Sequence, residues 1–594
     1  MTAARAAGGH AAGRAAASPA ADRLAAGRPT AGSPAAASPA AGSPAAGSPA
    51  AGSPAATHRA RQMLARAHWA AGAFTGYDRA SVLRIAGAVA AAAHSQARRY
   101  AEWAVKETGF GVAEHKVIKN EACSLGVFER YRDEDFVSPR IDAEAKIVSL
   151  PRPAGVVLAL TPSTNPVCSV FFKVILALLT RNAIVVSPHP MAQDCCADAA
   201  RLLAGAATEA GAPDGTIQVV QDVTVPLIEA LMADPVTSVI VATGGTAVVR
   251  AAHRSGNPAL GVGPGNVPVL VDATADLAAA ARLITESKAF DNAVLCTNES
   301  VLIVEDPAAA GLLREMQRRH AVLLDEAGRD KLRDYLFPAG RLNGEAIGKD
   351  AAWIAARAGL RVPPRTKVLL APFDLVLPEE KLASEKLCPV LGVVRAQSAA
   401  QGIEAARAVV RIGGAGHSAA VHSQDPPTII RFAERVPVLR VAVNAGNSTG
   451  SAGLDTNLAP SMTLGTGFPG HSSIGENLEP RHLVNWTQVA YHSAADAVFH
   501  DFGGVTSGQP PAGPVPAYPV ASNLPGAGLT GPAGNGPALG GGAGPAAEWS
   551  ASWPAGRPDR AAGGGQAGSA AVPDAIREQL RALIIEELQQ LGKG

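Results

Sequence analysis

The chain has 594 residues, a length that suggests several domains of roughly 100–200 residues each. Lys and Arg number 52 and Asp and Glu number 51, for a formal net charge of +1, which argues against a broadly basic nucleic-acid-binding protein and against an acidic solvating tail. No apolar run approaches the roughly 18 residues of a membrane-spanning helix, and the N-terminus has no apolar stretch typical of a secretory signal. Six scattered cysteines are typical of a reducing cytoplasm rather than of a disulfide scaffold.

Residues 1–56 are of low complexity, and from Ala31 to Ala56 a Ser-Pro dipeptide recurs every five residues. Proline at this spacing is incompatible with a helix. Small side chains also bury too little surface to offset the entropy of ordering the chain. We therefore expect residues 1–56 to form a disordered tail.

Residues 57–502 have the patterning of a globular protein, and Arg79 to Thr108 reads as one long amphipathic helix. Apolar runs that alternate with helical stretches then predict strands at Gly155–Leu160, Ala183–Val186, Thr216–Val220, Ser238–Val241 and Val267–Val271. A second series predicts strands from Ser300 and at Lys367–Leu370, Val390–Val394, Ala419–His422 and Leu439–Val443. Such alternation indicates βαβ units with parallel sheets, so we expect an α/β fold whose two lobes meet at a ligand cleft.

Residues 503–572 are rich in Gly, Pro and Ala, a composition typical of a disordered, flexible linker. Residues 573–594 predict a helix with Asp574 as its N-cap. One face of this helix is apolar and consists of Ile576, Leu580, Leu583, Ile584, Leu588 and Leu591. Such a helix either docks on the core of its own chain or enters a groove on a partner, and the long tether favours the partner.

Three segments of the globular part carry residues suited to chemistry. Asn165, between two prolines just after a predicted strand, could donate its side-chain amide to a developing oxyanion. The Thr243–Gly245 turn follows another strand and opens a helix, so a cofactor could approach its backbone closely. Cys296 lies between a helical stretch and a strand. Alone, such a cysteine is more often a small buried apolar residue than a nucleophile.

Taken together, these segments resemble the aldehyde dehydrogenase superfamily, and within it the CoA-acylating branch found in bacterial microcompartments. The matching strings are TPSTNP (161–166), VVSPHP (185–190), TGG (243–245), PALGVGPGNVPV (258–269), FDNAVLC (290–296), EKLCPVLGVV (385–394), GHSAAVHS (416–423), VNAGNSTG (443–450) and TLGTGFPGHSSIGENLEPRHLVN (463–485). They occur in the family's order and cover nearly all of the globular part.

The resemblance implies the aldehyde dehydrogenase fold. A Rossmann-like NAD-binding domain would occupy most of 57–270, with an oligomerisation hairpin near 141–154. The catalytic α/β domain would occupy 271–445, and 446–502 would return with an oligomerisation strand. The segment 503–572 would then be the linker and 573–594 a targeting helix.

The resemblance also implies roles for individual residues. Cys296 would be the catalytic thiol and Asn165 an oxyanion donor. His417 matches a histidine near the active-site entrance. The positions implied to bind the dinucleotide are Thr161, Pro162, Ser187, Gly244, Gly245 and Glu385, the last of them at the nicotinamide ribose. No metal is implied.

One departure from the hydrolytic members bears on the product. Those enzymes carry a water-activating Glu in an E-L-G-G-K string where this chain has Gly261–Gly265, and no acidic residue occurs between Thr243 and Val271. The acylating branch lacks this Glu as well, so a thioester is the expected product. A second departure is Ser187-Pro188-His189, which replaces the lysine that binds the adenosine ribose, so NAD is expected and NADP stays open.

The expected activity is oxidation of a short-chain aldehyde, propionaldehyde or acetaldehyde, to acyl-CoA. By resemblance the chain would form a homo-oligomer, a dimer or a tetramer, within the lumen of a cytoplasmic microcompartment. Residues 573–594 would bind a shell protein, and neither nucleic acid nor a membrane is an expected partner. Two alternatives stay open, namely a hydrolytic aldehyde or semialdehyde dehydrogenase that releases a free acid, and a catalytically dead scaffold.

Overall fold

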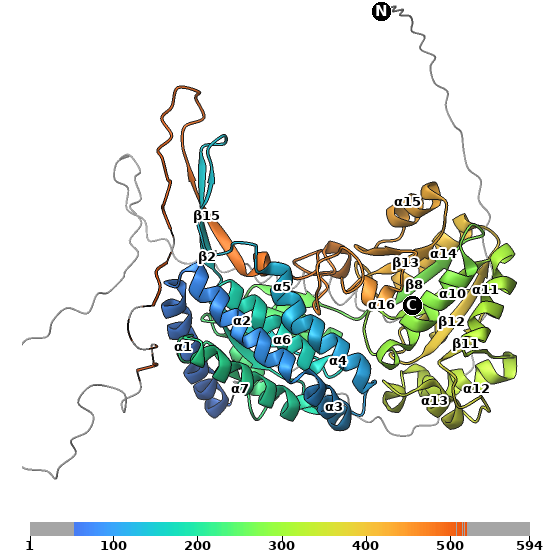
Figure 1. Ribbon diagram of the computed structural model, residues 1–594. Helices are drawn as coiled ribbons and strands as arrows, with labels where there is room; N and C mark the ends of the chain where they lie inside the picture. Colours follow the sequence, from blue (N-terminus) through green and yellow to red (C-terminus); the bar gives the residue numbers. More distant parts are fainter. Residues whose placement is uncertain (1–52, 507, 512, 514, 516, 520–594) are drawn as a thin grey trace, which may run out of the picture. The chain divides into compact units, whose positions relative to one another are not determined.

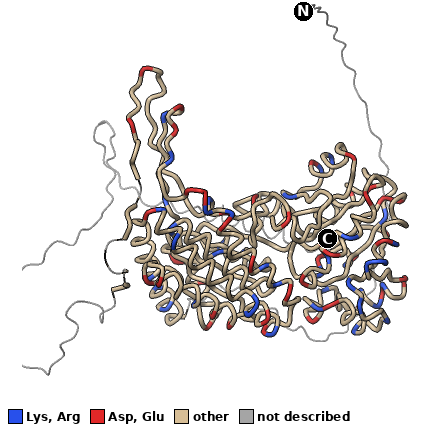
Figure 2. The backbone as a smooth tube through the Cα atoms, in the orientation of Figure 1, with Lys and Arg blue, Asp and Glu red and all other residues tan. Residues whose placement is uncertain are grey.

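The computed structural model describes residues 53–506, 508–511, 513, 515 and 517–519. The predictions made for the Ser-Pro tail and for the helix at 573–594 lie outside the described residues. No helix within the described ranges is long and apolar enough to cross a bilayer. Lys and Arg are interspersed with Asp and Glu along the described chain (Figure 2).

A five-stranded parallel sheet organises the first lobe, which we define as residues 54–262 (Figure 1). Its order is β5-β4-β3-β6-β7, so the first of these strands in the sequence lies at the centre, as in doubly wound folds. The strands are β3 (Val156–Leu160), β4 (Ala183–Ser187), β5 (Ile217–Val219), β6 (Val239–Thr243) and β7 (Ala259–Val262). Four of them confirm predicted strands, whereas β7 had been interpreted as part of a glycine-rich turn.

Both faces of this sheet are covered because alternate residues of its strands point to opposite sides. Val157 and Ala159 belong to one buried cluster, together with residues of α2, α3, α5, α6 and α7. Val156 and Leu158 belong to another, together with residues of α1, α8 and α9. The helices are α1 (Pro54–Thr75), α2 (Arg79–Ser95), α3 (Ala97–Thr108), α5 (Val127–Tyr131), α6 (Pro166–Leu179), α7 (Gln193–Glu209), α8 (Val225–Ala233) and α9 (Thr246–Arg254). A further helix, α4 (Ala113–Glu121), packs on α3.

The single helix predicted over 79–108 is two helices, because Gln96 leaves the helical conformation with φ −108° and ψ 9°. Helix α1 begins at Pro54, inside the segment that was expected to be disordered. Proline is accommodated there because the first turn of a helix has no intrahelical partner for its N–H groups.

A seven-stranded parallel sheet organises the second lobe, which we define as residues 267–443 (Figure 1). Its order is β10-β11-β12-β9-β8-β13-β14. The strands are β8 (Val267–Val271), β9 (Glu299–Glu305), β10 (Ala321–Leu323), β11 (Val368–Pro372), β12 (Val390–Ala396), β13 (Ala419–His422) and β14 (Val441–Val443). The predicted domain boundary at 270/271 therefore needs correction, because β8 pairs with β9 and β13 rather than with the first sheet.

Helices cover both faces of the second sheet as well. Val269 and Val271 pack against α10 (Leu277–Ala289) and α11 (Asp306–Arg318). Leu270 lies on the opposite face. The helices packed there are α12 (Glu326–Leu336), α13 (Ala351–Arg357), α14 (Ala399–Ile412) and α15 (Pro426–Arg435). The short helix α16 (Asn447–Gly450) follows β14.

A third, antiparallel sheet brings together two strands from the region near 141–154 and one strand from the region after 446. It consists of β1 (Arg140–Asp142), β2 (Ile147–Pro153) and β15 (Val484–Ala490), in the order β1-β2-β15 (Figure 1). Strand β15 pairs with β2 along its whole length, from Val484 opposite Pro153 to Ala490 opposite Ile147.

The first residues of the segment expected to be a linker from residue 503 contact the first lobe. Gln509 donates its backbone N–H to the Gly76 carbonyl at 2.8 Å and accepts from the Asp78 N–H at 3.2 Å. Further along, the Tyr518 ring meets Trp69 edge-on, with 5.8 Å between the ring centroids. Backbone groups can pair whatever the composition of the segment, so a run rich in Gly and Pro still lies against the first lobe.

Candidate active site

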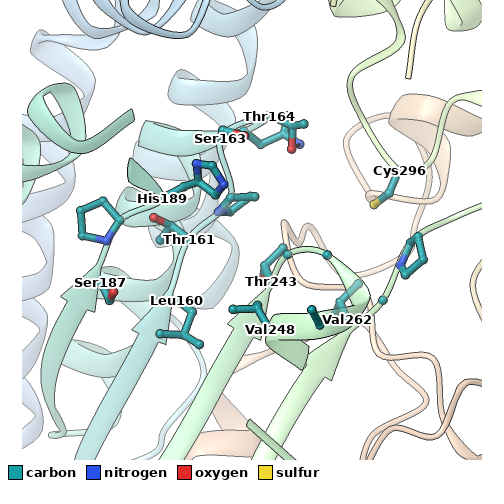
Figure 3. Close-up of a pocket in the computed structure, with 18 of the residues that line it drawn as sticks. Leu160, Thr161, Ser163, Thr164, Ser187, His189, Thr243, Val248, Val262 and Cys296 are labelled. Carbon is teal, nitrogen blue, oxygen red and sulfur yellow. Dashed lines mark hydrogen bonds between the residues drawn. The ribbon is translucent and has the colours of Figure 1, made fainter. Parts of the chain in front are cut away.

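A cavity of about 700 Å³ opens where the strands of the first sheet end (Figure 3). Parallel pairing in register brings the carboxyl ends of β3, β4 and β6 to one edge, since Leu160 lies opposite Ser187 and Ala242. The second lobe supplies another part of the wall. Of the residues singled out in the sequence, those that line the cavity are Thr161, Pro162, Asn165, Ser187, Gly244, Gly245, Cys296 and Glu385.

The edge formed by β3, β4 and β6 fits a dinucleotide. The Thr161 hydroxyl is buried and has no hydrogen-bond partner within the described residues. A Cβ placed on Gly245 would have no other atom within 4 Å, so the space beside this residue at the cavity wall is open. Gly245 is also the N-cap of α9 and makes no side-chain cap, which leaves N–H groups of the first turn available to a phosphate.

Cys296 differs from the other cysteines of the described chain. It is partly exposed and the other five are buried, and its sulfur points toward the cavity (Figure 3). Burial of the sulfur, reinforced by the nearby Glu385, raises the pKa of Cys296 to about 12, although Arg440 and Lys119 act in the opposite direction. In the ligand-free protein the thiol is therefore protonated near neutral pH.

Asn165 is the N-cap residue of α6, with φ −133° and ψ 60°, outside regular structure as the flanking prolines predict. Its side-chain oxygen accepts a hydrogen bond from Lys119 Nζ at 2.6 Å. Its Nδ2 donates to Thr164 Oγ1 at 3.3 Å. The carboxamide thus lies on the cavity wall that Cys296 also lines, with an N–H donor still to spare.

Glu385 lies on the cavity wall beside the thiol. Burial raises the pKa of Glu385 to about 8, while the Gly265 N–H, Lys288 and Lys386 partly oppose that rise. At neutral pH this carboxyl group is therefore mostly protonated, so it can donate a hydrogen bond as well as accept one.

His417, which the resemblance matches to a histidine near the active-site entrance, is not among the residues that line the cavity. Its side chain is fully buried and is not part of the cavity wall. Its Nδ1 lies 3.0 Å from Ser418 Oγ, and its Nε2 has no partner among the described residues. Burial, together with the Arg440 charge, lowers the pKa of His417 to about 3. The imidazole of His417 is therefore neutral near neutral pH.

Sequence reasoning missed a buried charge cluster beside Asn165. It consists of Lys116 and Lys119 of α4 and of Asp291, whose carboxylate both lysines contact. All three side chains are almost completely buried. Lysines three residues apart on a helix normally indicate a solvated face, so local patterning does not predict that Lys116 and Lys119 are buried.

Known protein families and sequences also match this chain. The sequence pattern described as "Aldehyde dehydrogenase family" matches residues 30–332. The chain is 36% identical over 423 residues to the bifunctional aldehyde-alcohol dehydrogenase AdhE of Escherichia coli, covering 70% of this chain and 48% of that protein. It thus spans about half the length of that relative. It is 33% identical to the succinate-semialdehyde dehydrogenase (acetylating) of Clostridium kluyveri, covering 73% of this chain and 95% of that one.

Solved structures are similar over the same region. An acetylating aldehyde dehydrogenase from Geobacillus thermoglucosidasius has a TM-score of 0.72 and 36% identity, covering 74% of this chain and 97% of that one. A propionaldehyde dehydrogenase from the fucose utilisation bacterial microcompartment of Clostridium phytofermentans has a TM-score of 0.66 and 26% identity, covering 74% and 98%.

Proposed function

The chain belongs to the aldehyde dehydrogenase family, and from this premise we propose that it is a CoA-acylating aldehyde dehydrogenase that uses NAD. One observation carries the proposal. The cavity is lined both by a thiol, Cys296, and by an amide donor, Asn165, while the segment Gly261–Gly265 supplies no carboxylate to activate water. Such a site can form a thioester but is poorly equipped to hydrolyse it.

In the proposed reaction the Cys296 thiolate attacks the aldehyde carbon. The raised pKa means that the thiol must first lose its proton, and a change in its surroundings on ligand binding has to favour the thiolate. The negative charge that develops on the aldehyde oxygen meets the free N–H of Asn165. One such donor contributes roughly 10²–10³-fold to turnover.

The dinucleotide would be held by residues that line the cavity, namely Thr161, Pro162, Ser187, Gly244 and Gly245 at the sheet edge and Glu385 of the second lobe. When bound, NAD accepts the hydride that leaves the aldehyde carbon. Whether NADP also serves is open, because Ser187-Pro188-His189 carries no lysine for the adenosine ribose.

The acyl group then leaves as a CoA thioester. The CoA sulfur attacks the thioester carbonyl carbon, the bond to Cys296 breaks, and the proton of the CoA thiol is transferred in net terms to the Cys296 thiolate. No oxidant is needed in this half, because both sides are thioesters.

The test measures NADH formation from propionaldehyde and acetaldehyde, with and without CoA. With CoA, turnover should be sustained. Without it, the enzyme should release about one NADH per site and then stall. The Cys296→Ser variant should fold and form no NADH.

Sustained turnover and free acid without CoA would support the hydrolytic alternative instead. Glu385 would then be the residue to replace, because it is the carboxyl group beside the thiol on the cavity wall. An enzyme inert under both conditions, with Cys296 unreactive toward aldehyde, would support the scaffold alternative. The ratio of kcat/KM for the two aldehydes decides between propionaldehyde and acetaldehyde.

We also propose that the enzyme is located in the lumen of a bacterial microcompartment. This location is supported by the apolar face predicted in residues 573–594 and by the microcompartment origin of one similar structure. The partner would be a shell protein that receives this face. A fluorescent protein fused to residues 573–594 should co-localise with shells, and Leu580→Glu with Leu588→Glu should abolish this. Identical distribution of both fusions would contradict the targeting role.

A homo-oligomer is proposed as well, with the β1-β2-β15 sheet as the contact. The residues of β1 are exposed, and Ile141 is 44% exposed within an otherwise charged strand. Light scattering should give the mass of a dimer or tetramer. A monomer at micromolar concentration would contradict the proposal.

A further inference from the structure

Lys119 is a buried cation that touches both sides of the candidate site. It lies on α4 with 1% of its side chain exposed. Its Nζ donates to Asn165 Oδ1 at 2.6 Å and also to Asp291 Oδ2. The first contact reaches the start of α6 in the first lobe, and the second reaches the segment that leads to Cys296.

The contact with Asn165 determines which end of the carboxamide faces the cavity. An ammonium group can only donate, so it must meet the amide oxygen. The amide nitrogen is then turned away from Lys119. One of its hydrogens goes to Thr164 Oγ1, and the other is left for an oxyanion. Without the cation, nothing else described would hold the amide oxygen in this orientation.

The contact with Asp291 holds an unusual backbone in place. Asp291, Asn292 and Ala293 have φ values of 50°, 51° and 59°, a conformation that side chains other than glycine rarely adopt. The Asp291 carboxylate accepts from the Val112 N–H at 2.7 Å and from both Lys116 and Lys119. These bonds anchor the residues that immediately precede the thiol.

We infer that Lys119 is a positioning residue for the reaction: its ammonium group bonds Asn165 and Asp291 at once and so fixes the oxyanion donor relative to the Cys296 segment. The inference rests on the roles proposed above for Asn165 and Cys296. It assigns Lys119 no contact with substrate.

The charges of the cluster support this role. Burial alone would raise the pKa of Asp291, but Lys119 and Lys116 hold it below its ordinary value, so the carboxylate is ionised. Two lysines against one carboxylate favour negative charge nearby, and Lys119 lowers the pKa of Cys296. The same field favours a thiolate and an oxyanion.

Lys116 is a matched control because it also contacts Asp291 from α4 but makes no hydrogen bond to Asn165. It is buried on the same helix and bonds Asp291 Oδ2 at 3.0 Å, but its other partner is the Thr164 main-chain carbonyl. Either lysine can be replaced by methionine while the other still pairs with Asp291. Both variants should therefore fold, as thermal unfolding followed by circular dichroism will show.

The experiment uses the full chain and p-nitrophenyl acetate, with the p-nitrophenolate burst as readout. The Cys296 thiolate attacks the ester carbonyl and p-nitrophenolate leaves, so neither NAD nor CoA takes part. If the wild-type enzyme formed no NADH with aldehyde and CoA, the proposed function would be overturned. The burst experiment could still be interpreted, because it needs neither NAD nor CoA. Lys119→Met should slow the burst about 100-fold, and Lys116→Met at most about tenfold.

A double-mutant cycle decides whether Lys119 acts through Asn165. In an Asn165→Ala background, Lys119→Met should slow the burst by no more than about fivefold, whereas Lys116→Met should keep its full effect. Multiplicative losses for Lys119→Met, or equal losses for the two lysine variants, would overturn the inference. If Lys119→Met does not fold, Lys119→Gln and Lys116→Gln replace the pair, with the same two outcomes.

Discussion

Replacing Gly265 by alanine should damage the active site while leaving the protein folded. A Cβ built on Gly265 would lie 1.9 Å from the carbonyl oxygen of Cys296, whereas carbon and oxygen atoms that are not bonded need roughly 3.3 Å. Gly265 does not have a positive φ, so alanine would add no backbone strain. The whole effect must come from a displacement of about 1 Å or more between the turn and the nucleophile segment.

The magnitude follows from that displacement. A misplacement of about 1 Å at a reacting group can lower kcat/KM about 100-fold, which is roughly 2.7 kcal/mol of transition-state stabilisation. Overpacking of this kind costs about 1–3 kcal/mol of the free energy of unfolding. Because folded domains have about 5–15 kcal/mol to lose, the variant should remain folded and be nearly inactive.

Gly263→Ala is the matched control. It lies two residues away on the same turn, lines the cavity, and a Cβ there would meet nothing within 4 Å. NADH formation with aldehyde and CoA, together with thermal unfolding, should separate the two variants. If Gly265→Ala kept a kcat/KM within about threefold of Gly263→Ala, the steric reasoning would be refuted.

Three further predictions concern buried titratable groups. Because the pKa of Cys296 is about 12, its alkylation by iodoacetamide in the free enzyme should accelerate about tenfold per pH unit from pH 7 to 9. Glu385→Gln should accelerate this alkylation above pH 8. A rate that reaches a plateau below pH 9 would contradict the raised pKa. Burial lowers the pKa of Lys173 to about 7, so the unfolded chain binds more protons between pH 7 and 10 and stability should rise with pH there. Lys173→Met should flatten that rise in urea titrations while costing about 1–3 kcal/mol through the loss of hydrogen bonds to two main-chain carbonyls. The pKa of His417 is about 3 because of burial and the Arg440 charge, so stability should fall as pH drops from 6.5 to 3. His417→Leu should move acid unfolding to lower pH. An unchanged midpoint of acid unfolding would count against the buried neutral imidazole.

Strands of the two parallel sheets were predictable because they are buried on both faces. Runs such as Val156–Leu160 and Val390–Val394 contain no polar side chain and are bounded by turn signals. Such runs have few alternatives to a central strand. The short edge strands β7 and β10 were missed. Ala259–Val262 contains a glycine and lies within a glycine-rich segment, so its pairing with β6 depends on the sheet and not on local preference.

For the candidate site, the sequence located the residues that line the cavity but not the environment behind them. Motifs name the positions that touch a ligand, and Cys296 and Asn165 could be found that way. The burial of His417, Lys116 and Lys119 depends on contacts between segments far apart in the chain. Lys119 is hydrogen-bonded to Asp291, which lies 172 residues further along the chain. Local sequence patterns cannot predict a contact over that separation.

The pairing of β15 with β2 has a consequence for synthesis on the ribosome. The second lobe is contiguous, from β8 to β14, and can fold as soon as its own residues emerge. The first lobe cannot be completed then, because Val484–Ala490 and Gln509 add to it only after the whole second lobe has been made.

Until then β2 has an unpaired edge, which is a ready template for pairing with another chain. Nascent chains on neighbouring ribosomes could meet there before β15 arrives. Strand β15 therefore completes the lobe and also covers the edge of β2. Truncation before residue 484 should yield aggregates rather than a smaller soluble protein.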